Sequence, residues 1–428
     1  MAEILTPECR LEPYWWRAAP RESADPPPLP GRTDVAVVGS GITGLVAAMH
    51  LARGGRDVTV IEAGVPGEGG SSRNAGYVGR TLKHTFGEVI ESDGLEFAKR
   101  VYGELAEAFN AVKATIESER IDCHFRQQGR LLLATSPEMR EAMLREFGLR
   151  EKHLGEPFST VSKQEQAAEI DTPRYFGGVR ISDHAGLHAG LYHQGLLQRA
   201  RGAGARVVAH TAVRSVSRDG GTFRLATDRG SIAARDVVLA TNGYTDGAVP
   251  WLQRRVIPFD AYAVATEAMD PAEVARLLPG DRTFIDWNFN VDFIRRAPGD
   301  PSRILFGGLT GERTQDLPAF ARRLHARLVR VLPKLSRVRF DNVWTGRCAG
   351  TIDLYPHIGV HEGMHYGIGY CFAGVPMGTL FGIKIARRIL GEPGGDSVYD
   401  RPLPSHWLYQ GNPWMVPWAI RWMSRHDK

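Results

Sequence analysis

The segment from Thr33 to Glu62 constrains the fold most, because it reads as an apolar strand, a glycine turn, a helix and a second strand in one short stretch. The run Val35–Val38 predicts a parallel strand buried on both faces, and a G-x-G-x-x-G pattern follows it at once. Gly39 permits the sharp turn, Gly41 lets the backbone approach a pyrophosphate, and Gly44 lets the helix pack closely against the strand. Free N–H groups at the helix N-terminus can then bind the phosphates. The segment therefore predicts a dinucleotide site.

The second strand, Val58–Ile61, ends in an acidic residue about 20 positions beyond the turn. There the carboxylate of Glu62 can accept hydrogen bonds from a ribose diol, and it would repel a ribose 2′-phosphate. Glycines at this spacing arise by chance in a chain that carries 48 of them, so the motif is specific only because both strands, the helix and Glu62 are in register. The motif alone leaves NAD and FAD both open.

A second glycine-rich loop, Gly69–Gly76, begins shortly after Glu62 and reads GGSSRNAG. It is too polar and too rich in glycine for a core element. Its hydroxyls, guanidinium and amide suit a segment wrapped along an extended flavin dinucleotide, whereas a nicotinamide site has no obvious use for it. The loop therefore favours FAD, and the alternative is an ordinary surface turn.

Further motifs follow in order along nearly the whole chain: Tyr14-Trp15-Trp16, Ser182–His188, Val237–Tyr244, Leu305–Gly308, Trp344–Gly346, Pro356–Gly359 and Gly369-Tyr370. With the two glycine loops they resemble the amine and amino-acid oxidoreductases of the D-amino-acid oxidase superfamily, and within it most closely the γ-glutamylputrescine oxidoreductases. The resemblance implies an FAD enzyme that oxidises a primary or secondary amine to an imine, which water converts to an aldehyde and an amine or ammonia. We expect an amine with an anionic tail, such as a γ-glutamylputrescine-like amine, an N-methyl or ω-amino acid, or an aminophosphonate. The electrons are expected to pass to O2 or to a quinone.

The implied fold is α/β, with a Rossmann-like FAD-binding domain of the glutathione-reductase type and a second α+β substrate domain built on an antiparallel sheet. At 428 residues the chain is long for one core, which agrees with two intertwined domains. The expected parts are an N-terminal arm (1–31), a discontinuous FAD-binding domain (32–85, 182–250 and 344–391), a substrate domain (86–181 and 251–343) and a C-terminal extension (392–428). Helices are expected over 86–119, 137–154 and 191–201, and strands over 206–210, 212–216, 222–227, 231–234, 237–240, 284–296 and 303–307.

A helix is predicted from Gly374 to Gly391, with Pro376 in its first turn and Gly391 as its left-handed cap. Gly378 and Gly382 extend a glycine stripe on which the sheet or the cofactor can lie. If this helix begins beneath the flavin ring, its positive end stabilises the negative charge of the reduced ring. The predicted FAD contacts, with Val213 placed at the adenine by resemblance, are Gly39, Gly41, Ile42, Thr43, Gly44, Glu62, Ala63, Ser71, Ser72, Arg73, Asn74, Ala75, Gly76, Val213, Thr241, Asn242, Gly346, Gly374, Val375, Pro376 and Met377.

Amine oxidation by a flavin depends on orientation more than on acid or base help, because a neutral amine held over the ring gives up hydride directly. Family members that act on α-amino acids place an arginine four residues after the tryptophan of a W-x-G motif, where it holds the carboxylate. Here that position, four after Trp344, is Cys348, and Arg347 is only a partial substitute. By resemblance to the sarcosine oxidases, Cys348 can also carry a covalent flavin. We expect a non-covalent flavin, because core cysteines are usually small buried hydrophobes.

The predicted catalytic and substrate-binding residues are His84, Trp287, Phe293, Arg295, Arg347, Cys348 and Tyr370. The aromatic members supply walls for an amine, and Arg295 and Arg347 are preferred to His188, Arg73 and Arg80 as contacts of an anionic tail. Lys83 is expected to be a solvated surface cation. No metal site is predicted.

Two other functions stay open. A 2-hydroxy-acid dehydrogenase on the same fold would need a base such as His188 or His84 to take the hydroxyl proton. A non-catalytic flavoprotein would bind FAD that no substrate reduces.

Composition limits the classes of partner and the cellular compartment that we expect. The chain is 43 % hydrophobic and 24 % charged with a net charge of +5, and it has no basic block with interleaved aromatics, so no nucleic-acid partner is predicted. Its four cysteines lack paired spacing, which indicates a reducing compartment. With neither a signal peptide nor a transmembrane span in the sequence, we expect a cytoplasmic protein.

Each end of the chain carries its own prediction. The proline-rich arm up to Pro30 is expected to be an extended tether laid on the surface. Near the C-terminus, Trp414, Trp418 and Trp422 share one helical face. We expect this face to dock onto the substrate domain. The alternative is a peripheral contact with a membrane that holds a quinone acceptor.

Overall fold

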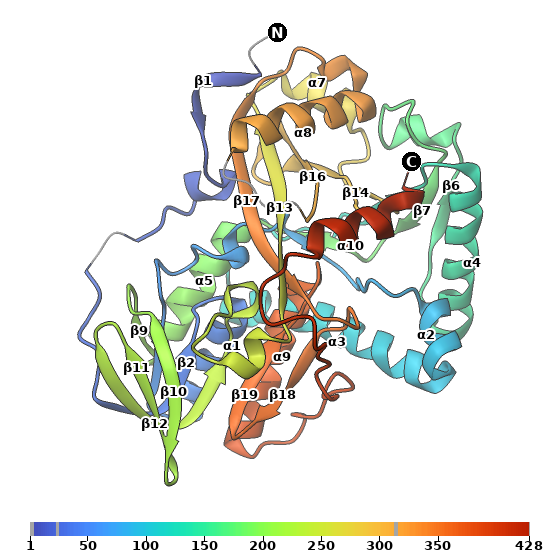
Figure 1. Cartoon of the computed structure of the whole chain (residues 1–428). Coiled ribbons are helices and arrows are strands. Elements are labelled where there is room, and N and C mark those ends of the chain that lie inside the picture. The colour runs from blue at the N-terminus through green and yellow to red at the C-terminus, as the bar shows by residue number, and fades with distance from the viewer. Residues whose placement is uncertain (1–3, 23–24, 312–315, 428) are drawn as a thin grey trace.

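Two β-sheets, joined by helices, form the body of the molecule (Figure 1). The computed structural model describes residues 4–22, 25–311 and 316–427. The α/β fold predicted from the sequence is confirmed, with a sheet built around parallel strands and a second sheet that is mostly antiparallel.

The first sheet contains the dinucleotide motif. Its strand order is β10-β11-β12-β2-β3-β9, and β19 pairs with the far end of β12 and with β18. The strands are β2 (Arg32–Val38), β3 (Val58–Ile61), β9 (Arg206–Val208), β10 (Val213–Asp219), β11 (Thr222–Thr227), β12 (Gly230–Leu239), β18 (His357–His361) and β19 (Met364–Ile368). Because β2 lies between β3 and β12 and runs parallel to both, its carboxyl end opens at the middle of the sheet, where parallel sheets bind ligands.

The second sheet has nine strands in the order β1-β17-β13-β16-β15-β14-β5-β7-β6. They are β1 (Leu5–Arg10), β5 (Arg130–Leu133), β6 (Ser159–Val161), β7 (Gly178–Ile181), β13 (Ile257–Thr266), β14 (Thr283–Asp286), β15 (Phe293–Ala297), β16 (Asp300–Gly308) and β17 (Phe340–Gly350). The pairs β1–β17 and β14–β5 are parallel, and the other pairs are antiparallel. A small pair, β4 (Tyr77–Val78) with β8 (Ala185–Gly186), lies apart from both sheets.

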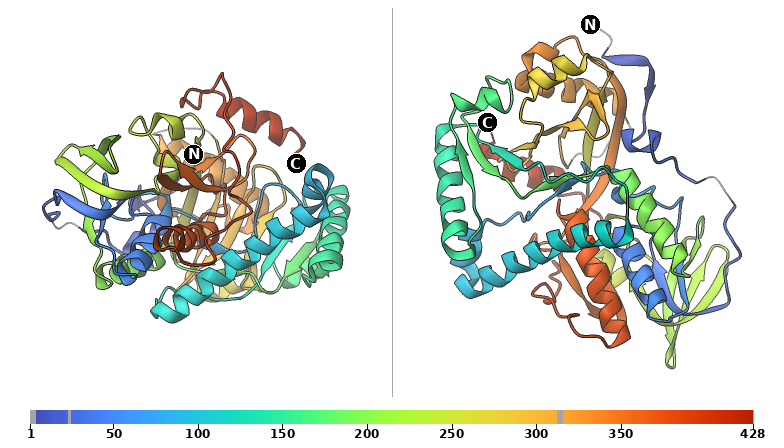
Figure 2. Two further views of the ribbon diagram at one scale, coloured as in Figure 1. Left: turned by 90° about the horizontal axis from the view of Figure 1, so that it is seen from below. Right: turned by 180° about the vertical axis from the view of Figure 1, so that it is seen from behind.

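The helices cover the sheets and connect them. They are α1 (Ile42–Arg53), α2 (Phe86–Asp93), α3 (Leu95–Glu119), α4 (Pro137–Leu154), α5 (Ala189–Gly202), α6 (Pro250–Gln253), α7 (Pro271–Leu277), α8 (Leu317–Val331), α9 (Gly374–Leu390) and α10 (Val416–Met423). Short 3-10 turns occupy Tyr14–Arg17, Gly70–Ser72, Glu165–Ala168, Asn242–Tyr244, Pro333–Leu335 and Ser424–His426. Figure 2 shows α3 crossing the molecule beside α9, which in turn packs against α1. In the described ranges, no helix combines the length and apolarity needed to cross a bilayer.

Three expected elements differ in detail. The strand expected over 284–296 is the hairpin β14–β15, and the strands expected over 231–234 and 237–240 form one continuous strand, β12. The helix expected over 86–119 breaks at Gly94, whose φ of 87° ends α2. The apolar periodicity continues across Gly94, so it did not indicate that one helix ends at this glycine.

The predicted helix at Gly374 is confirmed as α9, with Pro376 in its first turn and Gly391 at φ 72° as its cap. Two glycines of its stripe, Gly378 and Gly382, face helix α1 and not the sheet. A Cβ on Gly382 would lie 2.8 Å from the carbonyl oxygen of Thr43, so the stripe lets α9 pack closely on α1. This contact holds the two helix N-termini side by side.

The N-terminal arm is not the surface tether that its prolines predicted. Leu5–Arg10 forms the edge strand β1, and Trp15 is fully buried in the core. From there the arm runs down the outside of the molecule to β2, so it links the second sheet to the first (Figure 1). The prolines predicted the connecting stretch, but they did not indicate that Trp15, which precedes it, is buried in the core.

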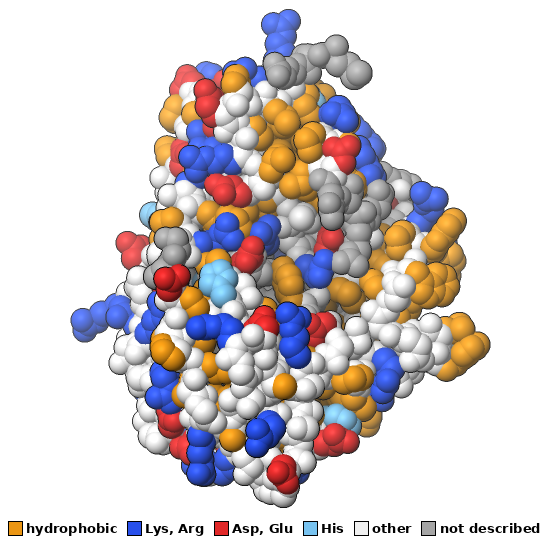
Figure 3. Space-filling model, turned by 60° about the vertical axis from the view of Figure 1, so that its left-hand side comes forward, with side chains coloured by type: hydrophobic (Ala, Val, Ile, Leu, Met, Phe, Trp, Pro, Cys, Tyr) orange, Lys and Arg blue, Asp and Glu red, His pale blue; other side chains and the backbone are white. Residues whose placement is uncertain are grey.

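The tryptophans near the C-terminus do not dock, contrary to expectation. Helix α10 instead packs through Val416, which contacts Phe259 and Cys371, while Trp414, Trp418 and Trp422 are 59 %, 68 % and 65 % exposed. We call these three side chains the Trp face. Figure 3 shows large apolar side chains standing out from this part of the molecular edge.

Candidate active site

A cavity of about 1170 Å³ extends from the glycine turn after β2 to the strands β5 and β14 of the second sheet. Residues of both sheets and of the helix ends between them line it. Its lining includes both glycine loops, the start of α9 and aromatic side chains of the second sheet. One continuous space therefore joins the predicted cofactor site to the predicted substrate site.

The glycine turn between β2 and α1 forms one end of the cavity. Gly39 has a positive φ of 100°, and a Cβ on it would lie 2.9 Å from the carbonyl oxygen of Ala240. A Cβ on Gly44 would lie 2.0 Å from the Gly39 oxygen, so the helix and the turn touch backbone to backbone. Within the described part of the chain, the amide N–H groups of Thr43 and Gly44 donate to no acceptor, because the first turn of a helix leaves them free. This geometry fits a pyrophosphate.

Glu62 ends β3 at the edge of the cavity, and the glycine turn orients its carboxylate. Oε2 accepts hydrogen bonds from the amide (2.9 Å) and the hydroxyl (2.6 Å) of Ser40, and Oε1 accepts one from the amide of Gly64 (3.0 Å). A carboxylate has about four acceptor positions, so one remains for a further donor. A ribose hydroxyl suits that position.

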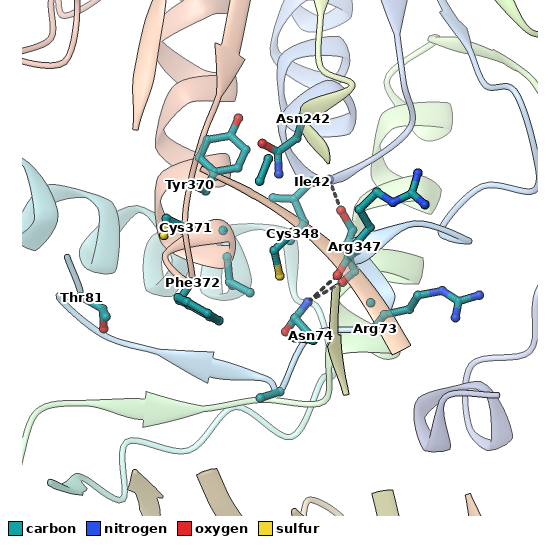
Figure 4. Close-up of a pocket in the computed structure, with 18 of the residues that line it drawn as sticks. Ile42, Arg73, Asn74, Thr81, Asn242, Arg347, Cys348, Tyr370, Cys371 and Phe372 are labelled. Atoms are coloured by element: carbon teal, nitrogen blue, oxygen red, sulfur yellow. Dashed lines mark hydrogen bonds between the residues drawn. The ribbon is translucent and has the colours of Figure 1, made fainter. Parts of the chain in front are cut away.

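The second glycine loop runs along the cavity and is held by three indole N–H groups from distant parts of the chain. These donate from Trp15 to the Asn74 carbonyl (2.9 Å), from Trp16 to the Ser72 hydroxyl (2.8 Å) and from Trp344 to the Arg73 carbonyl (3.0 Å). Inside the cavity, the amide of Ile42 donates to Ser71 Oγ (3.0 Å), and Asn74 Nδ2 donates to the Ser71 carbonyl (2.8 Å) (Figure 4). The loop is thus fixed against α1.

Most residues predicted to contact FAD line the cavity: Gly39, Gly41, Ile42, Thr43, Glu62, Ala63, Ser71, Arg73, Asn74, Ala75, Val213, Thr241, Asn242, Gly346, Gly374, Val375 and Pro376. Gly44, Ser72, Gly76 and Met377 lie behind its surface. Ser72 is occupied by Trp16 and the Gly67 carbonyl, and a Cβ on Gly76 would meet the Leu187 carbonyl. These residues shape the wall and do not form its surface.

The turn that precedes α9 is strained. Cys371 (φ 39°) and Phe372 (φ 75°) are consecutive non-glycine residues in the left-handed region, a conformation that costs about 1–3 kcal/mol per residue and is often found at functional sites. The amide of Cys371 donates to the Ala349 carbonyl (2.9 Å), and the hydroxyls of Tyr370 and Thr43 share a 2.6 Å hydrogen bond. These bonds tie the turn to β17 and α1, and they direct the N-terminus of α9 into the cavity.

Cys348 lies on β17 with its sulfur directed toward the space between Asn74 and Phe372 (Figure 4). Burial raises the pKa of its thiol to about 12, so the thiolate is scarcely populated at neutral pH. The guanidinium of Arg347 points away from this space and lies 3.5 Å from Asp260 (Figure 4). This position therefore presents a neutral thiol to the cavity.

Arg295 lies outside the cavity lining, which corrects its predicted role as a substrate contact. Its Nη1 donates to the carbonyls of Gly76 (2.9 Å) and Leu187 (3.2 Å). Burial lowers the pKa of this guanidinium to about 10, so it stays charged at neutral pH. Its hydrogen bonds hold the end of the second glycine loop in place.

His188 also lies outside the cavity lining. Its Nδ1 accepts the amide of Leu191 (3.1 Å) and caps α5, and burial with the neighbouring His124 lowers its imidazole pKa to about 4. It is therefore excluded as the base that a 2-hydroxy-acid dehydrogenase would need. His84 does line the cavity, stacked on Tyr355 with its Nε2 2.7 Å from the Asp353 carbonyl.

Lys83 lines the cavity and is not the surface cation that we expected. Its ammonium donates to the Phe289 carbonyl (2.8 Å) and lies 4.2 Å from the Phe289 ring centre and 4.8 Å from that of Phe372. Burial lowers the pKa of this amine. Trp287, Phe293 and the hydroxyl-bearing Tyr370 line the cavity as predicted.

The lining residues that the sequence analysis did not predict include three buried polar ones, Arg130, His184 and Asp286. Arg130 and Asp286 are single polar residues in apolar strands with no motif around them, and His184 lies inside the Ser182–His188 motif but was given no role there. Burial and the nearby Asp292 raise the pKa of the Asp286 carboxyl well above its ordinary value. Only the pairing of β5, β7 and β14 brings these side chains to one end of the cavity.

Known proteins share both the sequence pattern and the fold. The chain is 29 % identical over 391 residues to the probable oxidoreductase OrdL of Rhizobium meliloti, with 88 % of each chain covered. It is 28 % identical to the γ-glutamylputrescine oxidoreductase of Escherichia coli, with 84 % of each covered. Among solved structures, glycine oxidase from Geobacillus kaustophilus superposes with a TM-score of 0.72 at 23 % identity, covering 88 % of this chain and all of that one.

A sequence model of one family spans most of the chain. The family description is FAD dependent oxidoreductase (DAO), and the match runs over residues 34–388. It includes both glycine loops, β17 and α9, which the cavity brings together. The chain therefore belongs to the DAO family of FAD-dependent oxidoreductases.

Proposed function

We propose that this protein oxidises the CH–NH group of a primary or secondary amine to an imine, which water hydrolyses to an aldehyde and an amine or ammonia. The observation that carries the proposal is one continuous cavity, whose lining includes both the start of α9 and the aromatic side chains of Trp287, Phe289 and Phe293. FAD supplies the two-electron acceptor for the hydride. Relatives named for γ-glutamylputrescine and glycine oxidation support an amine as the donor.

The chain's own residues orient the amine and exclude water. Loss of hydration between these aromatic walls disfavours the ammonium and so favours the neutral amine, which is the form that can release hydride. The cofactor end is supported by the free amides of α1, by Glu62 and by the N-terminus of α9, which favours negative charge. Because a protonated Cys348 thiol is a poor nucleophile, we propose that FAD is held without a covalent bond.

Flavin reduction tests this function. Purified protein is mixed anaerobically with amines, N-methyl amino acids, ω-amino acids, aminophosphonates and 2-hydroxy acids while the flavin absorbance is recorded. We expect bleaching by at least one amine. Bleaching by hydroxy acids alone would support the dehydrogenase alternative with His84 as base, and bleaching by nothing would support a non-catalytic flavoprotein.

We propose further that the Trp face contacts an anionic membrane surface, where a quinone can accept the electrons. Exposed tryptophans at four-residue spacing suit the bilayer interface, and guanidinium groups lie beside two of them. Arg425 is 4.3 Å from the Trp422 ring centre, and Arg421 is 5.9 Å from that of Trp418. The net charge of +5 favours anionic lipids.

Co-sedimentation with vesicles tests the Trp face. We expect binding to vesicles that contain phosphatidylserine, weaker binding to phosphatidylcholine alone, and a loss of about 10-fold in partitioning for the double variant W418A/W422A. The exposed Leu11, which lies on the N-terminal arm, provides the control variant Leu11→Ala. Equal partitioning of both variants would contradict the contact.

A further inference from the structure

Arg130, the first residue of β5, places a buried cation at the wall of the cavity. Its side chain is only 4 % exposed, and it lines the cavity. Nη1 donates to the hydroxyl of Thr81 (3.2 Å) and Nε to that of Thr283 (3.4 Å), and the guanidinium lies 5.1 Å from the Tyr77 ring centre. Burial lowers its pKa to about 10, so it remains charged at neutral pH.

No carboxylate in the described residues forms an ion pair with this guanidinium, and its Nη2 donates to none of their acceptors. Two neighbouring buried guanidinium groups differ from Arg130 in their partners. Arg80 pairs with Asp183 (2.6 Å) and Glu156 (2.9 Å), and Arg295 is surrounded by backbone carbonyls. A buried cation without a counter-ion is costly, so its persistence here indicates an anionic ligand.

His184 supplies an independent observation at the same place. Its Nδ1 is buried without a hydrogen-bond partner in the described chain, while its Nε2 accepts the amide of Arg80 (3.3 Å). Burial and the nearby charges of Arg130 and Arg80 hold the imidazole pKa well below its ordinary value, so the ring is neutral and carries its proton on Nδ1. The backbone of Gly79 packs directly against this ring, because a Cβ there would lie 2.6 Å from Nδ1. The neutral His184 ring therefore forms part of the wall beside Arg130 and offers its guanidinium no counter-charge.

We infer that Arg130 forms a subsite for a carboxylate of the substrate, and that this carboxylate is several bonds away from the carbon–nitrogen bond that is oxidised. The inference rests on the proposed amine oxidation. Thr81, which holds Nη1 of Arg130, lies on the far side of Phe372 from Cys348 (Figure 4). Because the position four residues after Trp344 presents the Cys348 thiol to the cavity, an α-carboxylate has no guanidinium there. The substrate class is therefore an amine with a remote carboxylate, such as an ω-amino acid or an N-acylated diamine.

Matched substrates test the subsite. The set comprises 4-aminobutanoate, 6-aminohexanoate and γ-glutamylputrescine, each beside the derivative whose carboxylate is a neutral carboxamide. Half-saturation of anaerobic flavin reduction gives the apparent Kd of each. We expect wild-type protein to prefer at least one acid over its amide by about 100-fold, as for a buried charge-assisted bidentate contact. Arg130→Gln should raise the Kd of the acid by about 100-fold and that of the amide less than about threefold.

Two further variants and one binding measurement complete the test. Arg130→Lys keeps the charge without the fork and should recover part of the preference, and it replaces Arg130→Gln if that variant does not fold. Arg180→Gln, in the paired strand β7 and outside the cavity lining, should behave as wild type. Glutarate and butanoate, which cannot be oxidised, should shift the flavin absorbance of wild type but not of Arg130→Gln.

The outcomes separate the two proposals. If no amine reduces the flavin, the proposed function is wrong, and the glutarate shift still reports on the subsite. If an amine does reduce the flavin but Arg130→Gln weakens acid and amide equally, or wild type shows no preference for the acid, then the subsite is wrong while amine oxidation stands.

Discussion

Gly44→Ala is expected to yield protein purified almost without FAD. The methyl group would lie 2.0 Å from the Gly39 carbonyl oxygen and 3.2 Å from Val37 Cγ1. The nearer atom belongs to the backbone of a turn that is itself fixed by a φ of 100°, so it cannot rotate away as a side chain would. The helix must therefore move from the strand, and the free amides of its first turn move with it. We expect the amount of flavin bound per protein to fall by about 10-fold or more. The free energy of unfolding should fall by about 1–3 kcal/mol.

Two other glycines calibrate this result. Gly103→Ala lies on the exposed side of α3, with nothing within 4 Å of the added carbon. This variant should keep its FAD, and its free energy of unfolding should rise by about 0.5–1 kcal/mol. Gly378→Ala would lie 3.1 Å from the Thr43 hydroxyl, a contact that a side chain can relieve, and should fall between the two. Flavin absorbance relative to protein absorbance measures all three. Full occupancy in Gly44→Ala would show that the close contact does not position the phosphate site.

The parts of the site that the sequence predicted are local in sequence. The turn from β2 into α1, the acidic end of β3 and the cap of α9 each depend on a few neighbouring residues, whose backbone preferences can be read directly. Gly39 is one example, because its position after a buried strand already required the turn in which it lies. The conformation of such residues can be predicted from the sequence because it does not depend on contacts with distant parts of the chain.

The substrate end could not be predicted in the same way, because it depends on which face of a strand each residue occupies. Arg295 and Arg130 are both arginines in apolar strands, and their sequence surroundings do not distinguish them. Gly76 and Gly186 leave room for the guanidinium of Arg295 on the closed side, where a Cβ on Gly186 would lie 2.7 Å from its Nη2. Arg130 instead faces the cavity through the pairing of β5 with β7 and β14. Strand register, which is set by long-range pairing, makes this choice.

Trp15→Ala is expected to be the most destabilising single change in the N-terminal arm. The indole is fully buried, with ring centres 4.8 Å from His188 and 6.5 Å from Trp344, and its Nε1 donates to the Asn74 carbonyl. Replacing a buried tryptophan by alanine costs about 3–5 kcal/mol through the lost contacts and the remaining cavity. The same change removes one of the three indole donors that hold the second glycine loop, so FAD affinity should fall together with stability.

An exposed tryptophan supplies the matched control for this change. Trp418→Ala removes the same side chain from a position that is 68 % exposed, and it should alter stability by less than about 0.5 kcal/mol. For Trp15→Ala we expect thermal unfolding to begin on the order of 5 °C lower, with flavin fluorescence appearing at or before the unfolding transition. A normal transition would mean that the arm merely rests on the core. Flavin release ahead of unfolding would instead assign Trp15 to the cofactor site, because a loop that has lost its tether opens before the two sheets separate.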